Sequence, residues 1–154
     1  MSARRSAGLL LFRRVPGTEV LLGHMGGPFW ARREAGAWTV PKGEYEDPEP
    51  AWAAARREFT EELGLPAPEG PALDLGEVRQ SGGKRVTVWA VEGELDPAAV
   101  VPGTFTMEWP RGSGREQSFP ELDRVAWFPL EEAAGLVVKA QSVFLERLAE
   151  HLGT

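Results

Sequence analysis

The sequence predicts one mixed α/β domain, of the α+β kind, in which a β-sheet lies between helices. Its 154 residues fit a single domain (residues 1–154) with a real hydrophobic core. No repeat, low-complexity tract or linker divides the chain. Short apolar runs typical of strands come first, then one helix, then further strands, then helices. This order favours a single sheet covered by helices.

The first 40 residues predict three strands. The apolar runs Ser6–Phe12 and Thr18–His24 are separated by a short turn sequence that ends in Pro-Gly, which predicts a β-hairpin or two adjacent strands. Met25–Ala37 contains two glycines, a proline and mixed charges, and we expect it to be a loop. Trp38–Val40 predicts a short strand, which Pro41 ends.

One helix is expected in the middle of the chain. Either Asp47-Pro48 or Pro50 provides a start signal, and we favour a start near Pro50. Gly64 is suited to the position after the last turn. One face carries a helically spaced apolar stripe, which we expect to be buried: Trp52, Ala55, Phe59 and Leu63.

The second half predicts four further strands. Ala72–Gln80 and Lys84–Gly93, the first two of these strands, flank a Ser-Gly-Gly turn and should form a hairpin. Thr104–Trp109 is expected to be another strand, Pro110–Pro120 a loop, and Arg124–Phe128 the last strand.

Two helices are expected near the C-terminus. Pro129–Gly135 has proline at its start and glycine at its end, as a short helix does. Ser142–Leu152 is amphipathic, and these side chains should face inward: Phe144, Leu145, Leu148 and Leu152.

The composition excludes several classes of site. The chain has no cysteine and only two histidines, His24 and His151, so disulfides, thiolate zinc sites and histidine-rich metal sites are excluded. The formal net charge is -6, which gives no general attraction for nucleic acid or anionic membranes. An anionic ligand would therefore need local cations, and bound metal ions would provide them.

The N-terminal segment superficially resembles a signal peptide. Its apolar core, Ala7–Phe12, is too short, arginines follow it, and no small-residue cleavage site appears. No stretch reaches transmembrane length. We therefore expect a cytoplasmic protein that does not bind membranes.

Three carboxylates gather on one side of the expected helix. Glu58, Glu61 and Glu62 fall within an arc of about 100° at the edge of the apolar stripe. Such like charges destabilise a helix, and oxygen-rich clusters suit Mg²⁺ or Mn²⁺. Arg57, four residues before Glu61, is placed to orient that carboxylate. The alternative is a solvated acidic face, which is common on helices.

The spacing of the whole stretch Gly43–Leu65 resolves this choice. It reads Gly, five residues, Glu49, seven residues, then Arg-Glu-Phe-Thr-Glu-Glu-Leu-Gly-Leu from Arg57. This resembles the Nudix box, G-x5-E-x7-R-E-U-x-E-E-x-G-U with U apolar, at every specified position. The preceding Trp-Thr-Val-Pro-Lys-Gly resembles the usual lead-in. The resemblance implies an α/β/α sandwich with a mixed sheet, and hydrolysis of nucleoside diphosphates linked to another group.

The resemblance also implies roles for residues of the box. Glu58, Glu61 and Glu62 would bind a divalent metal, Mg²⁺ or Mn²⁺, together with the backbone carbonyl of Lys42 beside Gly43. Glu49 would pair with Arg57 and hold the loop against the helix. The general base would be Glu58 or a glutamate outside the box. Candidates for that base or for an extra metal ligand are Glu108, Glu116, Glu121 and Asp123.

Substrate-binding residues are expected on both sides of the box lead-in. Lys42, next to the box, should contact phosphate. In the Met25–Ala37 loop, Phe29 and Trp30 either form a base-stacking platform with phosphate-binding arginines, Arg32 and Arg33, or close the loop onto the core. His24 should be structural and His151 exposed.

Several substrates are compatible with these features. The resemblance is greatest to nucleoside triphosphate or dinucleoside polyphosphate pyrophosphohydrolases. ADP-ribose or a nucleotide sugar is an alternative substrate, and a catalytically idle nucleotide sensor on the same scaffold is another alternative. Nucleic acid is not an expected partner because no basic tract appears. A homodimer is left open.

Overall fold

The computed structural model describes residues 4–154. Met1, Ser2 and Ala3, which begin the segment considered as a signal peptide, lie outside the described residues. Seven of the strands form one sheet: β1 (Arg5–Arg14), β2 (Thr18–Met25), β3 (Trp38–Thr39), β4 (Lys42–Glu44), β5 (Ala72–Arg79), β6 (Arg85–Glu92) and β9 (Leu122–Pro129).

The sheet is mixed. Its strand order is β3-β2-β1-β6-β5, with β4 also paired to β1 and β9 also paired to β2. Only the β1–β6 pairing is parallel among the described strands, and β1–β2 and β5–β6 are antiparallel. Both predicted hairpins are therefore confirmed. The turn between β5 and β6 is the 3₁₀ turn η1 (Ser81–Gly83).

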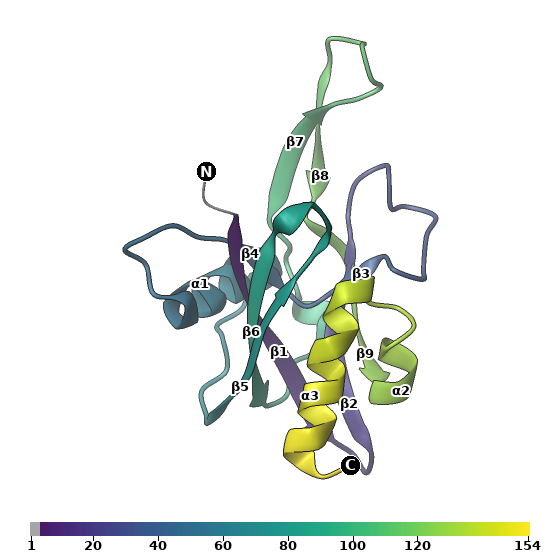
Figure 1. Ribbon diagram of the computed structural model, residues 1–154. Coiled ribbons are helices and arrows are strands. Elements are labelled where there is room, and N and C mark those ends of the chain that lie inside the picture. The colour runs from purple at the N-terminus through teal and green to yellow at the C-terminus, as the bar shows by residue number, and fades with distance from the viewer. Residues whose placement is uncertain (1–3) are drawn as a thin grey trace.

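Helices cover both faces of the sheet (Figure 1). The α1 helix (Ala51–Leu63) packs on one face, and α2 (Leu130–Ala133) and α3 (Ser142–Leu152) pack on the other. Side chains alternate along β1, so Leu9 joins Phe59 of α1 in one core cluster while Leu10 joins Phe144 of α3 in another. The predicted sandwich is confirmed.

The α1 helix begins and ends as predicted. Pro50 precedes its first residue, and Gly64 follows its last with φ 70°, a left-handed conformation that glycine adopts without strain. Ala55, Phe59 and Leu63 of the stripe are buried. Trp52 is half-buried and packs edge-on against Trp89 of β6, with 5.4 Å between ring centroids. This packing fixes which side of α1 faces the sheet.

The predicted loop Pro110–Pro120 is wrong in its second half. Glu116–Pro120 is a strand, β8, that pairs antiparallel with β7 (Thr104–Glu108). Among the described residues these two strands form their own sheet, and Figure 1 shows the hairpin projecting from the body of the protein. Its tip turns at Gly112 and Gly114, both with positive φ. Because β8 is exposed and mostly polar, it lacks the apolar alternation that marks a strand.

The strand β4 was not predicted, because Pro41 and Gly43 are poor strand formers. It forms because Lys42–Glu44 pairs with Ser6–Gly8 of β1. The same pairing places the start of the Nudix-like stretch beside α1. Within residues 4–154, no helix combines the length and the apolarity needed to cross a membrane.

Candidate active site

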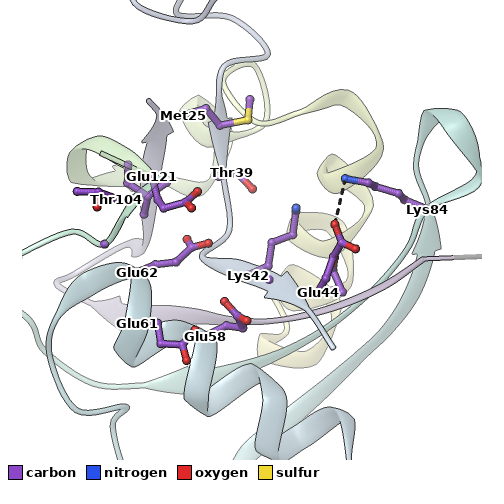
Figure 2. Close-up of a pocket in the computed structure, with 14 residues that line it drawn as sticks. Met25, Thr39, Lys42, Glu44, Glu58, Glu61, Glu62, Lys84, Thr104 and Glu121 are labelled. Atoms are coloured by element: carbon purple, nitrogen blue, oxygen red, sulfur yellow. Dashed lines mark ion pairs between the residues drawn. The ribbon is translucent and has the colours of Figure 1, made fainter. Parts of the chain in front are cut away.

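A cavity of about 440 Å³ opens where α1, β4 and the start of β9 meet. The lining includes the backbone of Gly43 and side chains from β1, β2 and β3, so distant segments build it together. Figure 2 shows the charged side chains that point into it. These are Lys42, Glu44, Glu58, Glu61, Glu62, Lys84 and Glu121.

The three α1 carboxylates differ in their surroundings. Glu61 is the most exposed, with 57% of its side chain accessible, whereas Glu58 is 13% accessible. Glu62 is half-buried, and its Oε2 is the buried side-chain oxygen or nitrogen without a hydrogen-bond partner in residues 4–154. Burial raises the pKa of Glu62 to about 8 and also raises the pKa of Glu58.

Lys42 faces the carboxylates from β4 and lies between α1 and Glu44 (Figure 2). Burial lowers the pKa of this ammonium group, while the charge of Glu62 acts in the opposite direction. The same attraction moderates the rise in the pKa of Glu62. The two groups therefore support each other's charged form in a poorly hydrated place.

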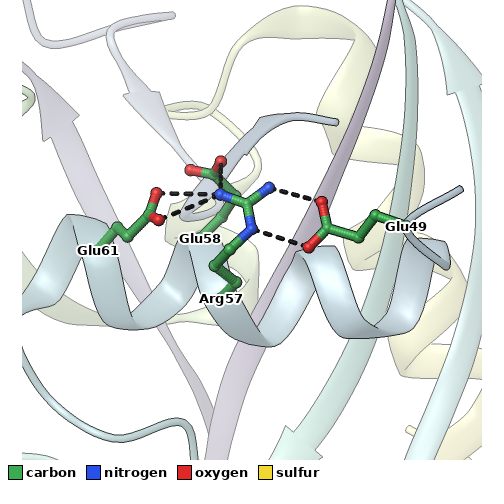
Figure 3. A network of polar contacts seen from close by, with 4 residues as sticks. All are labelled: Glu49, Arg57, Glu58 and Glu61. Atoms are coloured by element: carbon green, nitrogen blue, oxygen red, sulfur yellow. Dashed lines mark hydrogen bonds and ion pairs between the residues drawn. The ribbon is translucent and has the colours of Figure 1, made fainter. Parts of the chain in front are cut away.

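Arg57 links the loop before α1 to the carboxylates on α1 (Figure 3). Its Nε and Nη2 donate to the two oxygens of Glu49, both at 2.8 Å. Its Nη1 donates to Glu58 at 2.8 Å and to both oxygens of Glu61 at 3.1 and 3.2 Å. The Glu49–Arg57 pairing is thus present, and the hydrogen bond from Arg57 lowers the pKa of Glu49. One guanidinium fixes the orientation of three carboxylates.

Replacing Arg57 with alanine should reduce both stability and activity. Glu49 would lose its bidentate partner, and Glu58 and Glu61 would lose the hydrogen bonds that orient them. We therefore expect a free energy of unfolding lower by about 2 kcal/mol and a ~10- to 100-fold lower kcat/KM. Urea unfolding and steady-state hydrolysis would measure these effects. Arg56→Ala is the matched control, because Arg56 binds Glu69 and the carbonyl of Pro68 instead. Equal losses in both variants would contradict the assignment.

Gly43 lets the backbone of β4 approach α1 closely. A Cβ at this position would lie 1.9 Å from an oxygen of Glu58. Only glycine leaves room for the Glu58 carboxylate where it is. The Glu58 carboxylate therefore explains why glycine is needed at position 43, the first residue of the Gly43–Leu65 stretch.

The donor set fits a hard divalent cation. The unpaired Oε2 of Glu62 faces a cavity with four further carboxylates, and carboxylate oxygens are the ligands that Mg²⁺ and Mn²⁺ prefer. Within residues 4–154, no three acidic or imidazole side chains converge closely enough to be a preformed metal site. Two of the carboxylates, Glu58 and Glu61, are instead held toward Arg57 by its Nη1.

The four acidic candidates outside the stretch lie in different places. Glu121 lines the cavity, where it faces Glu62, and burial raises its pKa. Asp123 instead pairs with His24, with 2.7 Å between its Oδ1 and His24 Nδ1. Glu108 accepts from the N–H groups of Gly112 and Gly114 at the hairpin tip. Glu116 is exposed on β8. Of these four acidic residues, only Glu121 lines the cavity.

The candidates in the Met25–Ala37 loop lie outside the cavity lining. Phe29 is 50% exposed, and its ring meets Trp109 of the β7–β8 hairpin at 5.6 Å between centroids. Trp30 is half-buried, with the guanidinium of Arg33 5.6 Å above its ring, and Arg32 is exposed. Phe29 does not close the loop onto the core, because it contacts the hairpin.

Sequence reasoning missed Lys84. It lines the cavity from the end of the β5–β6 turn, and its Nζ lies 3.9 Å from Glu44 (Figure 2). The composition offered one indication of its importance, because only three of the 17 lysine and arginine residues are lysines. Two of these three, Lys42 and Lys84, line the same cavity.

The fold has many solved relatives. The C. elegans Ap4A hydrolase, solved as a binary complex, superposes with a TM-score of 0.69 at 22% identity, over 98% of both chains. The NUDIX domain of Shewanella oneidensis NrtR, complexed with ADP ribose, gives 0.67 at 15% identity, over 99% of this chain and 90% of that one. The M. smegmatis Nudix hydrolase RenU gives 0.62 at 25% identity, over 99% and 88%.

A model of the NUDIX domain family matches residues 3–148, nearly the whole chain. The protein therefore belongs to the NUDIX domain family and is a Nudix hydrolase. A search of curated proteins gave no match.

Proposed function

We propose that the protein is a divalent-metal-dependent pyrophosphohydrolase that cleaves a phosphoanhydride bond of a nucleoside diphosphate linked to another group. Its preferred substrates are nucleoside triphosphates or dinucleoside polyphosphates. The relatives include an Ap4A hydrolase and a domain complexed with ADP ribose, so the fold alone does not determine the substrate. The observation that supports the proposal best is the unpaired Glu62 oxygen in a cavity lined by five glutamates and two lysines.

The charged residues of the cavity would have different roles in binding a polyphosphate. Mg²⁺ or Mn²⁺ held by Glu58, Glu61 and Glu62, with the carbonyl of Lys42, would neutralise phosphate charge and acidify the attacking water. Lys42 and Lys84 supply two ammonium groups that face the phosphates. Arg57 keeps Glu58 and Glu61 in fixed orientations by its hydrogen bonds. The acidic protein thereby gains a local attraction for an anion.

Glu121 is the residue we assign as general base. It enters the cavity from the segment before β9, opposite α1, and takes part in no ion pair among the described residues. Glu58, the other candidate, is held by Arg57, which disfavours accepting a proton. The raised pKa of Glu121 makes it a better proton acceptor than an exposed carboxylate.

A nucleotide panel with Mg²⁺ or Mn²⁺, with products identified by chromatography, tests the function. We expect metal-dependent turnover of ATP-like or Ap4A-like compounds above that of ADP-ribose and nucleotide sugars. Turnover of the sugar compounds alone would overturn the substrate assignment. Nucleotide binding without any turnover would identify an idle sensor and overturn the proposed activity.

Replacing Glu121 with glutamine should lower kcat by about 10²- to 10⁴-fold, because the proton acceptor is lost. The concentration of Mg²⁺ needed for half-maximal rate should change little if Glu121 is not a ligand. Steady-state rates at several Mg²⁺ concentrations separate the two roles. Glu116→Gln, an exposed change on β8, is the control and should be silent. An unchanged kcat in Glu121→Gln would exclude it as the base.

A further inference from the structure

Aromatic side chains from two segments that are distant in the sequence meet outside the cavity lining. Phe29 of the Met25–Ala37 loop contacts Trp109 at the end of β7, edge to face at 5.6 Å between ring centroids. Phe29 remains 50% exposed. Trp109 is half-buried, so the pair leaves contiguous apolar surface accessible, and contiguous apolar surface on a monomer generally marks a binding site. This pair is therefore a candidate binding surface for an apolar or aromatic group of a ligand.

One face of the β7–β8 hairpin extends this pair. Phe105 and Met107 of β7, and Trp109 directly after its end, alternate with exposed polar residues and are half-buried, so they share a face. Phe105 also pairs across the strands with Phe119, at 5.9 Å between centroids. We refer to Phe29, Phe105, Met107 and Trp109 as the aromatic platform.

The hairpin holds Trp109 in a fixed place. The N–H of Trp109 donates to the carbonyl of Arg115 at 3.0 Å, and its own carbonyl accepts from Gln117 Nε2 at 2.9 Å. Glu108 accepts from the N–H groups of Gly112 and Gly114, which closes the tip. A two-stranded hairpin is marginally stable alone. These bonds order the tip without burying its aromatic side.

The loop that carries Phe29 is held equally well. The N–H of Gly26 donates to the carbonyl of Glu121 at 3.0 Å, and the N–H of Met25 donates to that of Ala37 at 2.9 Å. Fully buried His24 reaches the carbonyl of Arg33 through Nε2 at 2.6 Å. Because a carbonyl only accepts, Nε2 carries the proton. Both halves of the platform are thus preorganised, which lowers the entropic cost of binding.

The platform is continuous with the cavity. Met25 and Thr104 both line the cavity, and the segments that follow them lead directly into the platform. At Gly27, a Cβ would lie 3.0 Å from the Phe105 ring, so loop and hairpin are in close contact. From Phe105 to Trp109 an extended strand covers about 13 Å. A ligand whose phosphates lie in the cavity needs a chain of several phosphates to reach the far end.

We propose that the aromatic platform binds the base of a nucleoside that is tethered to the reacting phosphates by a polyphosphate chain, as in a nucleoside triphosphate or a dinucleoside polyphosphate. This inference rests on the proposed function and names the part of the substrate that gives specificity. Base stacking suits the site because every nucleobase has an aromatic face, whereas a sugar phosphate has none. Arg32 and Arg33, both exposed, lie on the same loop as Phe29 and give that loop positive charge.

Equilibrium binding tests the platform without relying on turnover. The probes are adenosine 5′-(α,β-methylene)triphosphate, which has a base, and inorganic tripolyphosphate, which has none, both titrated calorimetrically in Mg²⁺. Trp109→Ala should weaken binding of the nucleotide at least ~5-fold and leave that of tripolyphosphate unchanged. Phe29→Ala should act in the same direction, and Trp109→Phe should restore most of the affinity because a stacking face returns.

Thr106→Ala is the matched control, because Thr106 lies on the opposite, exposed face of the same strand and should be silent. Thermal unfolding of each variant checks that the hairpin change has not disturbed the domain. Equal binding of the nucleotide by Trp109→Ala and wild type would overturn the inference, and so would an equal weakening of both probes. If the nucleotide binds through Trp109 but the substrate panel shows no hydrolysis, the platform stands and the proposed activity fails.

Discussion

Replacing Glu62 with glutamine should abolish metal-dependent hydrolysis, with kcat/KM lower by at least about a hundredfold, while the fold survives. Glu62 presents an unpaired, buried oxygen to the cavity, and an amide cannot supply the charge that a divalent cation requires. Steady-state rates in Mg²⁺ would measure the loss. We expect the same direction for Glu61→Gln, which changes the exposed member of the triplet.

Stability separates this prediction from simple damage to the protein. A buried carboxylate that lacks a partner is costly, so its replacement by a neutral amide of the same shape should not lower the melting temperature in EDTA. Glu46→Gln, an exposed change outside the cavity lining, is the control. Full activity in Glu62→Gln, or a loss explained by unfolding, would count against a metal-binding role.

Replacing Gly43 with alanine should lower kcat by about a hundredfold. The added Cβ would occupy the position of the Glu58 carboxylate, 1.9 Å from its oxygen, and would force that side chain away from its bond to Arg57. A displacement of about 1 Å at a catalytic group is enough for such a loss. The melting temperature should fall only slightly, because the far end of the side chain can move.

Gly17→Ala is a matched control for the general effect of adding a methyl group to a glycine. Gly17 lies between β1 and β2 and has open space around its Cβ position. It should leave both hydrolysis and stability almost unchanged. Wild-type kinetics in Gly43→Ala would show that close approach of β4 to α1 is not required for the reaction.

The helix at the centre of the site could be predicted because its signals are local. Pro50, Gly64 and the stripe around Phe59 lie within 15 residues of one another, and each acts through the helix itself. The carboxylates on one side of α1 follow from the same periodicity. The Glu49–Arg57 pair, by contrast, was expected only from the resemblance to the Nudix box, since its members are on different elements.

The features that sequence reasoning missed depend on contacts between distant segments. The strand β8 is stabilised by its partner β7 and shows little pattern of its own. Phe29 was left between two interpretations because its partner, Trp109, is 80 residues away. Glu121 could not be separated from Glu108 or Asp123 until the fold placed one of them in the cavity.

Direct titration of Mn²⁺ into the metal-free protein, followed by electron paramagnetic resonance, tests the central claim that the cavity is a metal-dependent catalytic site. The account predicts that wild-type protein binds Mn²⁺, that Glu62→Gln weakens this binding at least ~10-fold, and that hydrolysis rises with the bound fraction. Hydrolysis that proceeds fully in EDTA, or equal Mn²⁺ binding by wild type and Glu62→Gln, would contradict it.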